Sequence, residues 1–188
     1  MNLQRLASSL LAVSLAGLGT VRADFTADAD LNGAQEVPAN ASAAFGSAAL
    51  TYTTSGDSLA YSVSFGDLLG FASVAHIHFG DPGLTGPVIL PLANPGPPSA
   101  TSGTFLGTLT SADLIPSPAS GILTFADAIA AIRGGHTYVD IHETAFPGGE
   151  IRGQFRVRSI PEPASLLLMG VGIAGIATYG WRSCRMAG

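Results

Sequence analysis

Three of the four histidines lie in two short stretches whose pattern suits metal binding. His76 and His78 are two residues apart in Ala-His-Ile-His, and His142 lies in the later sequence Asp-Ile-His-Glu. Side chains of an extended strand alternate between faces at about 3.3 Å per residue, so His76 and His78 point the same way, about 7 Å apart at Cα. Imidazoles gathered on one sheet face are ligands for copper or zinc. The pattern predicts a metal site formed by His76, His78 and His142.

Carboxylates close to these histidines have a predicted supporting role. A metal-binding histidine usually donates its other ring N–H to a carboxylate or a carbonyl, and Asp140, Glu143 and Glu150 are the local candidates. The fourth histidine, His136, shares the strand parity of His142 but lies about 20 Å away along an extended chain, so we expect it to be exposed. The alternative is that each histidine is a hydrogen-bonded residue that only fixes the sheet.

The segments that carry these residues show the two-residue alternation of half-buried strands. Val139 and Ile141 share one apolar face, while Tyr138, Asp140 and His142 share the opposite one. We expect the apolar face to build a core and the opposite face to form a polar surface. Further segments with strand patterns are residues 25–31, 45–53, 59–65, 88–92, 104–109 and 151–157.

One segment favours a helix. Thr124 suits the N-cap, Asp127 follows three residues later, and Gly134 is a suitable stop. About seven short strands with frequent turns predict an all-β fold, an antiparallel Greek-key sandwich or barrel with one short helix.

Composition places the folded part outside the nucleic-acid-binding classes. The 188 residues fit one domain, and the single cysteine, Cys184, rules out an internal disulfide. Residues 24–163 carry all 13 acidic residues but only four of the eight arginines, which gives a net charge of −9. A domain this acidic does not attract nucleic acid through its general field.

The two ends of the chain resemble export and sorting signals. Residues 1–23 have a basic start, an apolar stretch and a small-residue cleavage site after Ala23, which predicts a secretory signal peptide. Residues 164–181 are uncharged, apolar and just long enough to span a bilayer as a transmembrane helix, with arginines beyond them.

The sequence before this span identifies the kind of tail. Pro161-Glu162-Pro163, the apolar span and the arginines together resemble the PEP-CTERM sorting tails of Gram-negative bacteria, over residues 159–188. The resemblance implies an exosortase-type processing enzyme as partner, transient anchorage in the inner membrane, and removal of the tail.

Five motifs in order along the chain closely resemble the CHRD domain, which gives a predicted domain of residues 24–158. They are Leu31 to Pro38, Ala75 to His78, Gly86 to Val88, Tyr138 to His142, and Pro147 to Gln154. The resemblance implies an exported domain and says little about activity.

The histidine segments also resemble, more weakly, the copper half of the copper/zinc superoxide dismutases. His76 to Asp81 is similar to their His-x-His strand followed by Phe-Gly-Asp, and Ile141 to Glu143 is similar to the strand with the third copper ligand. Arg152 lies near the place of the arginine that guides superoxide. Residues 79–135 contain no histidine, so the resemblance implies a dismutase-like fold with a copper-only centre and no zinc site of the dismutase type.

Three functions follow from these observations. The first is an exported module that binds one copper ion through three histidines in the outer envelope or the extracellular matrix, where exopolysaccharide is a further expected partner. The second is a copper-only dismutase in which Arg152 attracts the anion. The third is a structural or adhesive matrix module without metal. Motifs of serine hydrolases, phosphate-binding loops and dinucleotide-binding folds are missing from the sequence.

Overall fold

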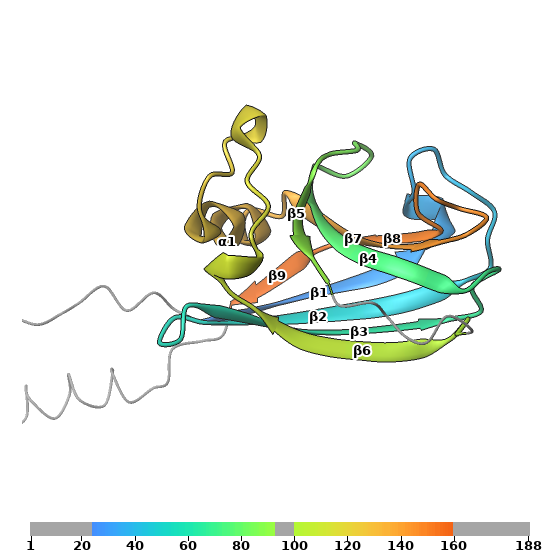
Figure 1. Ribbon diagram of the computed structural model, residues 1–188, viewed down its shortest axis with the longest axis horizontal. Helices are drawn as coiled ribbons and strands as arrows, with labels where there is room; N and C mark the ends of the chain where they lie inside the picture. Colours follow the sequence, from blue (N-terminus) through green and yellow to red (C-terminus); the bar gives the residue numbers. More distant parts are fainter. Residues whose placement is uncertain (1–23, 93–99, 160–188) are drawn as a thin grey trace, which may run out of the picture.

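A computed structural model describes residues 24–92 and 100–159 of the chain (Figure 1). The strands are β1 (Phe25–Asn32), β2 (Phe45–Thr53), β3 (Ser58–Gly66), β4 (Ala72–Phe79), β5 (Val88–Pro91), β6 (Gly103–Leu109), β7 (Thr137–Glu143), β8 (Ile151–Gln154) and β9 (Arg156–Ser159). The helical elements are α1 (Phe125–Arg133) and three 3₁₀ turns, Gly33–Gln35, Ser111–Asp113 and Pro118–Ser120.

The strands form one antiparallel sheet that curls into a nearly closed barrel. Eight of them follow the order β5-β4-β7-β8-β1-β2-β3-β6, and β9 pairs with β1 (Figure 1). The predicted all-β class with one short helix is therefore confirmed at the level of a mostly antiparallel barrel. The Greek-key, dismutase-like part of that prediction stays a prediction.

Alternation along the strands explains the core. In β3, Leu59, Tyr61, Val63 and Phe65 are buried, while Ala60 and Ser62 between them face outward and are exposed. This two-residue period is the sequence signal of a strand with one buried face. The barrel interior is filled in the same way by the other strands.

The helix begins and ends where the sequence indicates. The Thr124 side chain accepts a hydrogen bond from the Asp127 N–H, and the Asp127 carboxylate accepts one from the Thr124 N–H, which completes a capping box. Gly134 is the C-cap. Phe125, Ile129 and other apolar residues of α1 are buried, and the helix contacts β9.

The outer face of β4, β7 and β8 departs from the prediction. We predicted a polar surface there, but Tyr138, Asp140 and Arg152 are buried. The reason is that loops cover this face: the Gly86 N–H donates to the Tyr138 hydroxyl, and the Arg152 guanidinium donates to the Asp81 carbonyl. The β4–β5 loop, the segment after β1 and the β7–β8 turn lie on the same side of the barrel (Figure 1). The fold thus has a buried polar layer outside its apolar core.

The predicted terminal segments, 1–23 and 164–181, lie outside the described residues. Within residues 24–92 and 100–159, no helix has the length and apolar character needed to cross a membrane.

Candidate metal centre

Four side chains from two neighbouring strands converge in the polar layer. His76 and His78 come from β4, and Asp140 and His142 come from β7, which pairs with β4 so that His76 lies opposite Asp140. Because all four positions have the same parity in the antiparallel ladder, their side chains share one face of the sheet. One ligand atom from each residue lies within 4.8 Å of the other three.

The shortest distances in this cluster match those of a metal coordination shell. His142 Nε2 lies 3.1 Å from Asp140 Oδ1 and 3.3 Å from His76 Nδ1, and His78 Nε2 lies 3.2 Å from the same carboxylate oxygen. A tetrahedral ion with bonds of about 2.0–2.1 Å holds its ligand atoms about 3.3 Å apart. The cluster therefore has the dimensions of a four-ligand site.

Backbone carbonyls fix the tautomers of two histidines. Nδ1 of His78 lies 2.9 Å from the Gly86 carbonyl, and Nδ1 of His142 lies 2.9 Å from the Pro147 carbonyl. A carbonyl only accepts, so each Nδ1 carries the proton and each Nε2 presents a lone pair when the ring is neutral. Both lone pairs then face Asp140 Oδ1, and His78 Nε2 is buried without a hydrogen-bond partner. Several acceptors pointing at one another require a cation between them.

When no metal is bound, a proton on His142 takes the place of the cation, as the pKa shifts in the cluster indicate. Burial raises the pKa of Asp140, but interaction with His142 and His78 outweighs it and lowers the pKa to about 2. Burial lowers the pKa of His142, yet the Asp140 carboxylate outweighs burial and raises it above its ordinary value. Burial, followed by the charge of His142, lowers the pKa of His76. The metal-free site thus favours a His142–Asp140 ion pair with a neutral His76.

An aromatic stack holds the second histidine in place. The His78 ring stacks on Tyr138 with centroids 4.9 Å apart and 12° between the planes. The Arg152 guanidinium lies over the Tyr138 ring, 3.4 Å from its centroid. Burial raises the pKa of the Tyr138 hydroxyl, which accepts from the Gly86 N–H. The same Gly86 binds His78 through its carbonyl, so Tyr138 and Gly86 together orient the ring.

The structure gives the remaining candidate residues different surroundings. Asp140, predicted as a supporting acceptor, contributes a ligand atom to the cluster itself. Glu143 instead accepts from the Ala145 N–H, and Glu150 accepts from the Ser42 hydroxyl and the Leu69 N–H. The acceptors for the far ring nitrogens are the backbone carbonyls of Gly86 and Pro147, and sequence reasoning missed them because every residue has a carbonyl and residue type does not mark which one accepts.

The two basic candidates also differ from each other. Arg152 is only 2% exposed and donates to the Asp81 carbonyl, so its charge is buried beside the cluster. His136 is exposed, as expected, and its Nδ1 contacts the Asp81 carboxylate outside the cluster. His136 is therefore a natural control residue for tests of the site.

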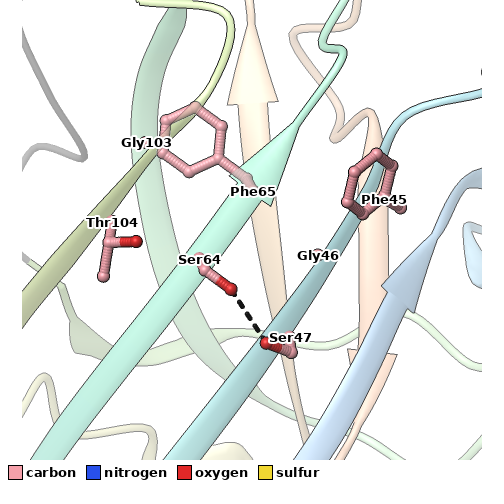
Figure 2. Close-up of a pocket in the computed structure, with 7 residues that line it drawn as sticks. All are labelled: Phe45, Gly46, Ser47, Ser64, Phe65, Gly103 and Thr104. Atoms are coloured by element: carbon pink, nitrogen blue, oxygen red, sulfur yellow. Dashed lines mark hydrogen bonds between the residues drawn. The ribbon is translucent and has the colours of Figure 1, made fainter.

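A separate hollow of about 400 Å³ lies over β2, β3 and β6. Figure 2 shows its lining, which includes Phe45 and Phe65 and the Ser47 and Ser64 hydroxyls, hydrogen-bonded to each other at 2.8 Å. Its lining residues carry no titratable group and no metal ligand. The chemistry of the described residues is thus concentrated on the opposite part of the sheet, at β4 and β7.

Comparison with known families gave two matches. The family model described as CHRD domain matches residues 27–155, and that of the PEP-CTERM protein-sorting motif matches residues 159–185. Both expected family resemblances are confirmed. No curated protein and no solved structure matches the chain, so the weaker dismutase resemblance has no match behind it.

Proposed function

The chain belongs to the CHRD domain family, and from that premise we propose that it is an exported copper-binding protein whose barrel holds one ion through His76, His78, Asp140 and His142. The PEP-CTERM motif implies export and sorting by an exosortase. The copper site is our addition, and it rests on the geometry of the cluster.

One observation carries the proposal. His78 and His142 each use Nδ1–H on a backbone carbonyl and direct Nε2 at Asp140 Oδ1, at 3.2 and 3.1 Å. Neutral rings in this arrangement oppose lone pair to lone pair, which is unfavourable unless a cation lies between them. A metal ion bonded to all four ligand atoms removes this conflict.

Copper is favoured over zinc by its intrinsic affinity. Three imidazoles and one carboxylate suit both ions, and Cu(II) binds more tightly than Zn(II) at a site of given nitrogen and oxygen ligands. The neighbouring zinc site of the dismutases would need further histidines, and residues 79–135 contain none. We therefore propose a single-ion site.

The proposed location follows from the sorting motif. Exosortase processing would remove the tail after transient anchorage in the inner membrane and leave the barrel in the outer envelope or extracellular matrix of a Gram-negative bacterium. There the protein would store or buffer copper, in contact with matrix exopolysaccharide. The alternative is a structural or adhesive module without metal. Copper binding in the titration described below would eliminate it, and no binding would support it.

A copper-only dismutase is the enzymatic alternative. It needs a coordination position open to superoxide and a cation that attracts the anion. Asp140 supplies a fourth protein ligand atom, and the guanidinium of Arg152 is engaged by Asp81 and Tyr138 in the buried layer. These contacts favour copper binding over superoxide turnover. A superoxide assay on the copper-loaded protein distinguishes the two functions.

The test is a copper titration of the purified, metal-stripped protein. We expect about one Cu(II) per chain, with nitrogen hyperfine structure in the electron paramagnetic resonance spectrum. Affinity should weaken as the pH falls through the raised pKa of His142, because a ligating imidazole must lose its proton. His142→Ala should weaken binding strongly, and the control His136→Ala, outside the cluster, should not. Equal copper affinity of the His142→Ala and His136→Ala variants would contradict the proposed site.

A further inference from the structure

A buried acid outside the four ligands lies in the segment after β1. Glu36 follows the 3₁₀ turn Gly33–Gln35, in the Leu31 to Pro38 motif that the metal ligands do not include. The residue is only 8% exposed, and its Oε1 atom is buried without a hydrogen-bond partner among the described residues. A buried carboxyl oxygen without a partner is costly, and the cost is greatest when the group is ionised.

The turn between β7 and β8 links this acid to the metal centre. Gly149 has φ +117°, and a Cβ atom there would come within 2.6 Å of Glu36 Oε1, so the bare glycine backbone closes over the carboxyl group. Two residues earlier in the same turn, the Pro147 carbonyl accepts from His142 Nδ1. One short turn therefore covers Glu36 and orients a metal ligand.

The charges that act on Glu36 belong to the strands beneath it. Burial and the negative charge of Asp140 raise the pKa of Glu36 to about 7, against the opposing effects of Arg152 and His142. On the other side, Glu36 and Arg152 line a hollow of about 170 Å³ together with Gln154 and part of the β4–β5 loop. In that loop, the carboxylate of Asp81 contacts His136. Near neutral pH the acid is thus close to its titration point, and it lines a hollow through which its proton can leave.

We propose that Glu36 is the charge-compensating acid of the metal centre and releases its proton when a divalent ion binds to the four ligands. The inference rests on the proposed copper site and deepens it. The ion adds two positive charges near the buried guanidinium of Arg152, and the Asp140 carboxylate neutralises only one of the three. Breaking the Glu36 O–H bond leaves a second carboxylate and passes the proton to water through the hollow. Copper uptake is thereby coupled to pH through a residue that does not touch the ion.

The test compares Glu36→Gln with wild type in copper titrations near pH 7, using buffers of different ionisation enthalpy to count protons released. Wild type should release up to one proton more per copper than the variant, and should bind copper about tenfold more tightly, a typical coupling between linked sites. Asp67→Asn is the control, because it neutralises an exposed carboxyl group that is not part of the metal cluster. It should behave like wild type in both measurements.

Infrared spectroscopy of wild type supplies an independent readout. The absorption of a protonated carboxyl group should be present in the metal-free protein and lost on addition of Cu(II), whether or not the variants fold. Two outcomes would overturn this inference but leave the proposed copper site standing. One is wild type that binds copper with this absorption unchanged. The other is a folded Glu36→Gln variant with the same copper affinity and proton release as wild type. Wild type that takes up no copper would overturn the proposed function as well.

Discussion

Replacing Asp140 with Asn tests the electrostatic account of the site without any metal. Asp140 is 3% exposed, and its pKa in the folded protein is about 2, against about 3.9 in an unfolded chain. Because the folded-state pKa is the lower one, the ionised carboxylate stabilises the fold above the unfolded value for as long as His142 keeps its proton. That stability is lost as the pH falls through about 2. The gap between the two pKa values corresponds to about 3 kcal/mol.

The pKa of His142 sets the upper pH limit of the stabilisation by Asp140. Its pKa is raised in the folded protein, so its contribution is complete below the ordinary histidine value and is lost as the pH rises through the raised value. Asp140→Asn should therefore destabilise the metal-free protein most between about pH 4 and 6. The difference should shrink toward pH 2 and again at alkaline pH. For a domain of this size, about 3 kcal/mol corresponds to a melting temperature about 10 °C lower.

The assay is thermal unfolding in chelator across this pH range. Asp67→Asn is the matched control, because Asp67 is exposed and Asn tolerates its positive φ of 59°. The control should follow the wild-type curve throughout. A constant difference between Asp140→Asn and wild type from pH 2 to 9 would refute the ion pair, because a loss of packing or shape does not titrate.

Two further predictions concern the stack and the tail. Tyr138→Leu removes the ring between His78 and Arg152, and should lower the free energy of unfolding by about 1–3 kcal/mol and weaken copper binding. Chemical denaturation measures the first effect and copper titration the second. An unchanged copper affinity would show that the stack does not orient the ligand. The PEP-CTERM motif predicts that the mature protein lacks residues from about Pro163 onward; intact-mass measurement on the secreted form checks this, and a retained C-terminal peptide would contradict it.

Local patterns were sufficient to predict the helix and most strands, but residues 151–157, predicted as one strand, divide at Phe155 into β8 and β9. Alternation depends on residues two apart and a capping box on residues three apart, so both can be recognised within a short window. The same reasoning placed His76 and His78 on one face. Asp140 has the same parity as His142, but parity alone does not say whether a carboxylate binds the ion or orients a ligand. The register between β4 and β7, which sets His76 opposite Asp140, brings this carboxylate into the cluster with the three histidines.

The burial of the polar face was beyond local prediction. It arises from loops that are distant in sequence from β7, such as the segment around Gly86 and the loop with Glu36. A pattern of polar residues predicts an exposed face unless the path of such loops is known. The sequence motifs around Leu31 to Pro38 and Pro147 to Gln154 nevertheless mark the two segments that cover the site. Their role became clear from contacts, not from residue type.

The position of the site outside the apolar core has a consequence for how the protein acquires its ion. On β4 and β7 the inward side chains, Ala75, Ile77, Val139 and Ile141, are fully buried in the barrel, while the ligands project from the opposite face. The core thus closes without using any metal ligand, and no internal disulfide is needed, since the single cysteine is Cys184. Without metal, the positive charge of His142 is matched by Asp140, and Glu36 is partly protonated near pH 7. On the proposed function, a barrel built in this way can fold first and bind its ion afterwards.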